Sequence, residues 1–96
     1  MIYTFDEIRS IVVPIVKEYG VSKISLFGSY AKGIATEDSD LDLIMDKGDL
    51  KGLQYFSLLR KLENSFDCDI DLITTGFSNK DFLRKIHNEE VLLYER

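Results

Sequence analysis

The chain has 96 residues, a length that suits one domain built around a single hydrophobic core. Hydrophobic residues make up 45% of it and charged residues 30%, a balance typical of globular proteins. The net charge of -5 makes direct binding to a nucleic-acid backbone unfavourable, although a bound divalent cation can reverse the local sign. We therefore expect one acidic domain over residues 1–96.

Membrane and export signals are not evident in the sequence. No apolar run approaches the ~20 residues of a membrane-spanning helix, and no signal peptide opens the chain. The one cysteine, Cys68, cannot form an internal disulfide, which fits a reducing compartment. We expect a cytoplasmic protein with no membrane contact.

A helix is the first predicted element. Thr4 and Glu7 have the spacing of a capping box, and Gly20 is a typical helix terminator. Pro14 interrupts the pattern and predicts a kink. Apolar residues follow at spacings of three and four, which places them on one helical face: Phe5, Ile8, Val12, Ile15 and Tyr19.

Residues 22–27, "SKISLF", then predict a strand, which the glycine-containing turn "GSYAKG" follows. A second strand is predicted at 40–45, and a second helix at about 50–66. The apolar face of that helix is expected to contain Leu53, Phe56, Leu59, Leu62 and Phe66.

A third strand is predicted at 69–74, and Gly76 ends it. A third helix at 78–88, capped by Ser78, should follow, and 91–94 form a short apolar tail that suits a strand or a helix. This order predicts an α/β (α+β) fold with a small mixed sheet of three or four strands and helices packed on one face.

Two of the predicted strands carry almost the same acidic pattern, "DLDLI" at 40–44 and "DIDLI" at 69–73. Side chains alternate along a strand, so Asp40 and Asp42 share one face, and Asp69 and Asp71 share one face. Neighbouring strands lie about 4.8 Å apart. If the apolar residues face the helices, the four carboxylates gather on the opposite face.

Such a group of carboxylates favours a metal site. Two carboxylates about 4 Å apart repel each other by roughly 4 kcal/mol at an effective dielectric constant of 20, and a hard divalent cation offsets that repulsion. A surface role is the alternative, since aspartates at strand edges often simply meet water. A calcium-binding loop does not fit, because Leu43 stands where the loop requires glycine.

The turn after the first strand can hold a phosphate. Gly28 permits close approach to the backbone, and Ser29 offers a hydroxyl group. The P-loop pattern is absent, because Ile34 follows Gly33 where that motif has lysine. The turn is informative because of its distance along the chain from the acidic strand, that is, the spacing between Gly28-Ser29 and Asp40-x-Asp42.

The segment "LFGSYAKGIATEDSDLDLIM" at 26–45 resembles the signature of the polymerase-beta-like nucleotidyltransferase superfamily, and most closely its minimal nucleotidyltransferase (MNT) domains. The resemblance extends over nearly the whole chain in element order. It implies a nucleotidyltransferase fold and an antitoxin that pairs with a HEPN toxin. It also implies that AMP is transferred from ATP to a tyrosine of that toxin.

The resemblance assigns roles to the carboxylates. Asp40 and Asp42 match the family's two metal ligands, and Asp71 matches the third catalytic carboxylate, so all three are candidate catalytic residues and ligands of two Mg²⁺ ions. Asp71 would also orient or deprotonate the acceptor hydroxyl. Asp69 stands outside this set, and we interpret it as a solvated residue.

The nucleotide-binding candidates are Gly28, Ser29 and Lys32. The family often has arginine at the position of Lys32; lysine can meet a phosphate but loses the bidentate geometry. Tyr30 could line the nucleotide pocket, although packing in the core is the simpler interpretation.

Three functions remain open. The first is a Mg²⁺-dependent protein adenylyltransferase, and the second is a catalytically silent antitoxin that acts by binding alone. The third is nucleotidyl transfer to a small molecule or an RNA end. The acidic charge of the chain disfavours an RNA acceptor. The intact set of carboxylates favours the enzyme, because a pure binder gains nothing by holding like charges together. We expect the partner to contact residues 89–96 and the rim of the pocket.

Overall fold

The computed structural model describes residues 2–77, 80–81, 84 and 89–96. Most of the helix predicted at 78–88 therefore lies outside the described residues. Within the described part, no helix is long and apolar enough to cross a membrane. The elements, in chain order, are α1 (Phe5–Glu18), β1 (Lys23–Phe27), α2 (Gly28–Lys32), β2 (Leu41–Asp46), α3 (Gln54–Ser65), β3 (Ile70–Thr74), η1 (Thr75–Phe77) and β4 (Val91–Glu95).

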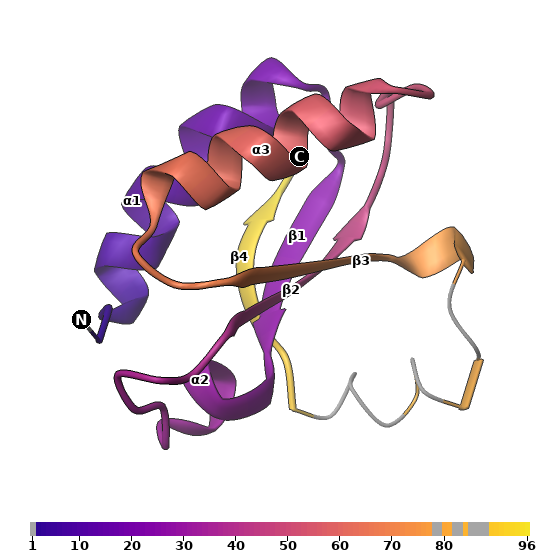
Figure 1. The fold of residues 1–96 in the computed structure, drawn as a ribbon. Helices are drawn as coiled ribbons and strands as arrows, with labels where there is room; N and C mark the ends of the chain where they lie inside the picture. The colour runs from indigo at the N-terminus through magenta and orange to yellow at the C-terminus, as the bar shows by residue number, and fades with distance from the viewer. Residues whose placement is uncertain (1, 78–79, 82–83, 85–88) are drawn as a thin grey trace.

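The four strands form one mixed sheet in the order β3-β2-β1-β4. β1 pairs antiparallel with both β2 and β4, whereas β2 pairs parallel with β3. The sheet is strongly twisted, so that β3 runs across the direction of β1 and β4 in Figure 1. The tail at 91–95 is thus a strand, which decides between the two states that the sequence left open.

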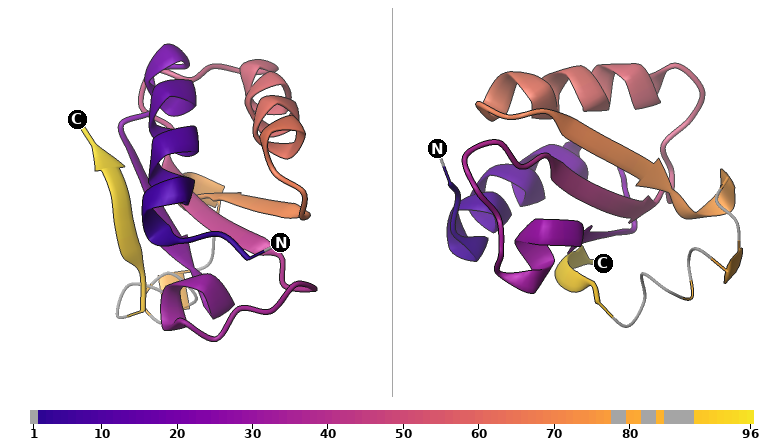
Figure 2. Two further views of the ribbon diagram at one scale, coloured as in Figure 1. Left: turned by 90° about the vertical axis from the view of Figure 1, so that its left-hand side faces the viewer. Right: turned by 60° about the horizontal axis from the view of Figure 1, so that its bottom comes forward.

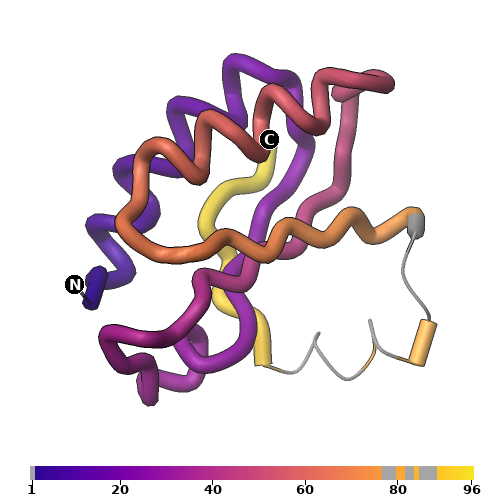
Figure 3. Tube along the Cα trace, viewed as in Figure 1, coloured from indigo at the N-terminus to yellow at the C-terminus, as the bar shows by residue number. Residues whose placement is uncertain are grey.

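The helices α1 and α3 lie side by side on one face of the sheet (Figures 1 and 2). α3 forms the connection between the two parallel strands: the chain leaves β2, runs along α3 and returns into β3 (Figure 3). The core between these layers includes Val12 and Val16 from α1, Leu58 and Leu62 from α3, and Leu43 from β2. The predicted mixed sheet with helices on one face is confirmed.

The first helix forms as its sequence predicts. Thr4 accepts a hydrogen bond from the Glu7 amide at 3.1 Å, and the Glu7 carboxylate accepts one from the Thr4 amide at 2.9 Å. This capping box satisfies amides at the N-terminus of α1. Gly20 follows the end of the helix with φ +75°, the left-handed conformation that glycine adopts readily.

The predicted apolar face of α3 was partly wrong. Leu53 and Phe56 are 80% and 63% exposed, whereas Leu58 is completely buried. The helix begins only at Gln54, and the face turned to the core contains Tyr55, Leu58, Leu59 and Leu62. The predicted residues Leu59, Leu62 and Phe66 do pack in the core, so only the first turn of the predicted face was wrong.

Candidate active site

Asp42 lies at the centre of the predicted acidic face. It is the second residue of β2, and the sheet register places it opposite Phe27 of β1 and opposite Asp71 of β3. Its neighbours Leu41 and Leu43 are fully buried in the core. Side chains alternate along a strand, so Asp42 and Asp71 both point to the face away from α1 and α3.

The surroundings of Asp42 disfavour its charged form. Partial burial, together with the charges of Asp71 and Asp40, raises the pKa of its carboxyl group from 3.8 to about 6. Burial is the largest cause, and the two neighbouring carboxylates add to it. A cation at this face would relieve both effects, because it would replace lost hydration and neutralise the repulsion.

Asp40 and Asp71 are more open to solvent than Asp42, and both are exposed. Asp40 directly precedes β2, and Asp71 lies in β3, the strand at the edge of the sheet. Within the described ranges, no three His, Cys, Asp or Glu side chains converge closely enough to be a ready metal cage. Exposed aspartates can rotate at little cost, so a cage at Asp42 would require the side chains of Asp40 and Asp71 to turn inward.

Gly28 lies directly against Asp42. It has φ +71°, and a Cβ atom at this position would collide with the Asp42 carboxylate, whose Cγ would be only 3.2 Å away. The glycine is therefore required twice, for its backbone conformation and for the space beside the carboxylate. The turn that the sequence associates with phosphate is thus in direct contact with the acidic face.

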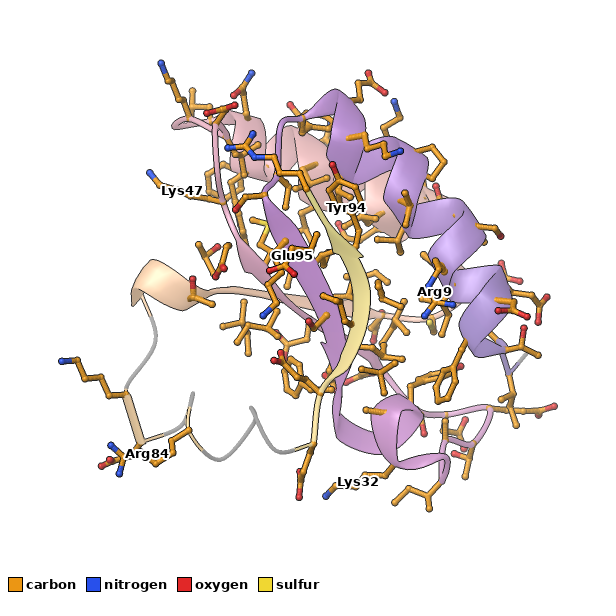
Figure 4. All side chains as sticks on the ribbon, turned by 180° about the vertical axis from the view of Figure 1, so that it is seen from behind. Arg9, Lys32, Lys47, Arg84, Tyr94 and Glu95 are labelled. Atoms are coloured by element: carbon orange, nitrogen blue, oxygen red, sulfur yellow. The ribbon has the colours of Figure 1, made fainter. Side chains whose placement is uncertain are left out.

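In the segment 28–33, which the sequence predicts as a turn, Gly28–Lys32 form the short helix α2 at the end of β1 (Figure 1). Ser29 is partly exposed in its first turn, and Lys32 is exposed at its end. The Lys32 ammonium group lies 3.4 Å from the Glu89 carboxylate, just before β4 (Figure 4). Both side chains are about half exposed, so this ion pair is weak.

Tyr30 belongs to the core. Its side chain is 3% exposed, and its hydroxyl oxygen accepts a hydrogen bond from the Tyr3 amide at 3.4 Å. It also lines an apolar cavity of about 340 Å³ between the N-terminal segment and α2. Neither the candidate carboxylates nor Gly28, Ser29 and Lys32 line that cavity, so it is distinct from the acidic face.

Sequence reasoning missed two contacts of the site. The ion pair between Lys32 and Glu89 joins residues that are far apart in the chain, so no local pattern predicts it. Tyr55 donates a hydrogen bond to the Leu72 carbonyl oxygen, directly after Asp71. Only its place on the buried face of α3, one turn before Leu58, could have suggested proximity to the sheet.

The family model for the polymerase beta nucleotidyltransferase domain matches residues 11–96. The match covers the glycine turn, the acidic strands and the four-stranded sheet described above. The chain belongs to this family. The contact between Gly28 and Asp42 therefore brings together the glycine turn and the acidic face of a nucleotidyltransferase domain.

Relatives of known name cover nearly the whole nucleotidyltransferase chain. The protein adenylyltransferase MntA of Thermococcus cleftensis is 37% identical over 93 residues, which are 92% of this chain and 94% of that protein. A Methanocaldococcus jannaschii protein, also named as a protein adenylyltransferase, is 32% identical over 87 residues, covering 90% and 94% of the two chains.

Solved structures share the fold. A minimal nucleotidyltransferase superposes with a TM-score of 0.80 at 24% identity, covering 93% of this chain and 95% of that one. A toxin-antitoxin crystallised with AMP-PNP gives 0.79 at 22% identity, covering 92% and 73%. A tri-AMPylated Shewanella oneidensis HEPN toxin in complex with an MNT antitoxin gives 0.74 at 19%, covering 97% and 74%. At these low sequence identities, the similarity shows a shared fold alone.

Proposed function

We propose that this chain is a Mg²⁺-dependent nucleotidyltransferase antitoxin, which transfers AMP from ATP to a tyrosine of a partner HEPN toxin. The observation that carries the proposal is the meeting of Asp42, Asp71 and Gly28 at one place on the sheet. Support also comes from the relatives, which are named protein adenylyltransferases, and from neighbours of the same fold that are toxin-antitoxin complexes.

The acidic face fits Mg²⁺. Asp40, Asp42 and Asp71 offer carboxylate oxygens, which are the donors that this hard cation prefers. Burial, together with the charges of Asp71 and Asp40, raises the pKa of Asp42, so its charged form would gain from a cation. When bound, two Mg²⁺ ions would neutralise the acidic face, screen the triphosphate and lower the barrier to displacement at phosphorus.

The glycine turn would hold the phosphates of ATP. Gly28 offers backbone without a side chain next to Asp42, so a triphosphate can approach the acidic face closely. Ser29 offers its hydroxyl group and backbone amide to phosphate oxygens. Lys32 would leave Glu89 and add a positive charge at the outer end of the triphosphate.

The reaction is an in-line displacement. The tyrosine oxygen of the partner attacks the α-phosphorus of ATP and forms a phosphodiester bond, while the bond from the α-phosphorus to its bridging oxygen breaks and pyrophosphate leaves. The phenolic proton must be lost during this step. Asp71, on the exposed edge strand, is placed to accept it or to orient the hydroxyl group.

The test uses the protein, Mg²⁺, a HEPN protein encoded beside its gene, and ATP labelled in turn at the α- and the γ-phosphate. Adenylyl transfer predicts that the α-label enters the partner and that the γ-label is released in pyrophosphate. If the γ-label entered the partner instead, the reaction would be phosphoryl transfer. If neither label entered and the partner was nevertheless inhibited in a tight complex, the antitoxin would act by binding alone.

A further inference from the structure

The strand that carries Asp71 is secured on only one side by the sheet. In the described part of the chain, β3 is an edge strand that pairs with β2 alone. The Asp69 carbonyl oxygen accepts a hydrogen bond from the Leu41 amide of β2 at 2.9 Å. Backbone groups alternate in direction along a strand, so the Asp71 carbonyl also points toward β2 and the Leu72 carbonyl points to the open edge.

Tyr55 of α3 binds that outward carbonyl. Its hydroxyl group donates a hydrogen bond of 2.7 Å to the Leu72 carbonyl oxygen. The bond is partly buried and joins two residues that are 17 positions apart in the chain. It satisfies a group that would otherwise have no strand partner, and it fixes the peptide unit between Leu72 and Ile73, one residue beyond Asp71, against the helix layer.

The Tyr55 ring is not held by packing on all sides. A cavity of about 130 Å³, lined also by Leu50 and Thr74, lies beside it. The Phe56 ring contacts it edge-on, with the ring centroids 5.4 Å apart. The hydroxyl bond therefore makes a large contribution to fixing where this side chain, and the strand it contacts, are placed.

Two forces act on the position of Asp71. Repulsion from Asp42, its register partner, pushes the edge strand away from β2, the ladder to β2 opposes that push, and the Tyr55 bond anchors the strand to α3. We propose that Tyr55 is a positioning residue of this site, which acts through the Leu72 carbonyl to hold Asp71 at the distance from Asp42 that cation binding and transfer require. This inference rests on the proposed function.

The hydrogen bond from the Tyr55 hydroxyl group also persists at neutral pH. Burial raises the pKa of the Tyr55 phenol, and the charge of Asp71 adds to the increase. The hydroxyl group therefore keeps its proton and remains a donor at neutral pH.

A matched control separates this role from general stability. Tyr3 makes a similar bond, since its hydroxyl oxygen accepts from the Asp67 amide at 2.8 Å, also partly buried. Both Tyr55→Phe and Tyr3→Phe delete one phenol-to-backbone bond, and each should lower the thermal midpoint by a similar amount. A purely structural role of Tyr55 predicts that the two variants behave alike.

The experiment measures Mn²⁺ binding by electron paramagnetic resonance, together with kcat and KM for ATP, for wild type and both variants. We expect Tyr55→Phe to weaken Mn²⁺ binding and to lower kcat between about tenfold and a hundredfold, with KM for ATP changed by less than about twofold. Tyr3→Phe should leave all three quantities within about twofold of wild type. Equal losses in the two variants would overturn the inference.

A double-mutant cycle in the Mn²⁺ dissociation constant tests whether Tyr55 acts through Asp71. In an Asp71→Asn background, Tyr55→Phe should change the Mn²⁺ dissociation constant by less than about twofold, because the carboxylate it positions is gone. Additive losses would contradict the inference. A wild-type protein that neither binds Mn²⁺ nor transfers AMP would contradict the proposed function itself, whereas an active wild type matched by Tyr55→Phe would contradict only the role of Tyr55.

Discussion

Asp42 and Asp71 stand opposite each other on the parallel strands β2 and β3, and burial together with the charges of Asp71 and Asp40 raises the pKa of Asp42 to about 6. The pair faces away from α1 and α3, next to the glycine turn at Gly28. A sheet gains no stability by placing like charges at register partners. The arrangement supports the proposed cation site.

Replacing Asp42 by asparagine should abolish transfer and yet stabilise the protein free of metal at neutral pH. Asparagine is close in size but is a poor metal ligand, and it removes the unfavourable charge. The thermal midpoint of Asp42→Asn at pH 7.5 in EDTA should lie a few degrees above that of wild type. A midpoint several degrees lower would show that Asp42 is structural.

The pH dependence of this difference follows from the pKa of Asp42. Between 3.8 and about 6 the folded protein binds more protons at Asp42 than the unfolded chain does, so this group lowers stability as the pH rises through that window. The gain in thermal stability from Asp42→Asn should therefore be complete above pH 6 and absent below pH 4. A difference in melting temperature that does not depend on pH would contradict the raised pKa.

ATP should bind weakly without a divalent cation. The acidic face repels a bare triphosphate, and Mg²⁺ would reverse that sign. Calorimetric titration should give clearly tighter ATP binding in Mg²⁺ than in EDTA. Asp40→Asn should reduce this difference in ATP affinity between the two conditions. Equal affinity under the two conditions would contradict the two-metal interpretation.

Asp71→Asn should separate nucleotide binding from chemistry. If Asp71 serves the acceptor hydroxyl, ATP affinity in Mg²⁺ should fall little while kcat falls by orders of magnitude. Asp69→Asn is the control, because Asp69 is exposed, lies just before β3 and is in no candidate role. An essential Asp69 beside a dispensable Asp71 would mean that the roles on this strand are assigned to the wrong residue.

Two glycines with nearly the same backbone conformation test the contact between the turn and the acidic face. Gly28 and Gly33 have φ of +71° and +74°, but a Cβ at Gly28 meets the Asp42 carboxylate, whereas nothing lies within 4 Å of one at Gly33. Gly33→Ala should cost about 1 kcal/mol, the strain of a left-handed alanine. Gly28→Ala should cost more in urea unfolding and should also weaken binding of Mg²⁺ and ATP.

Equal unfolding costs for the two alanine variants, with unchanged ATP binding in both, would show that the space beside Asp42 is unimportant. Because the backbone strain is shared, the difference between the variants reports the contact with the carboxylate alone.

Local patterns predicted much of the fold. The alternation of aspartate with aliphatic residues correctly placed Leu41 and Leu43 in the core, and the capping box at Thr4 set the start of α1. The face of α3 was predicted less well, because Leu53 and Phe56 continue the apolar spacing although the helix begins only at Gln54. Spacing alone does not show where a helix starts or which of two overlapping stripes is buried.

Contacts between segments that are distant in the chain could not be predicted from the sequence. The closeness of Gly28 to Asp42 depends on the antiparallel register of β1 and β2, which places Phe27 opposite Asp42. The bond from Tyr55 to Leu72 depends on how α3 lies on the edge strand. Single-sequence patterns give periodicity along the chain but give no register between segments.

The most direct test of the account is the intact mass of the partner HEPN toxin after incubation with this protein, ATP and Mg²⁺. The account predicts a gain of one or more AMP units, located on tyrosine by fragmentation, and no gain with Asp42→Asn, which should remain folded. A partner whose mass does not change, while it is held inhibited in a tight complex with the wild-type protein, would contradict the account.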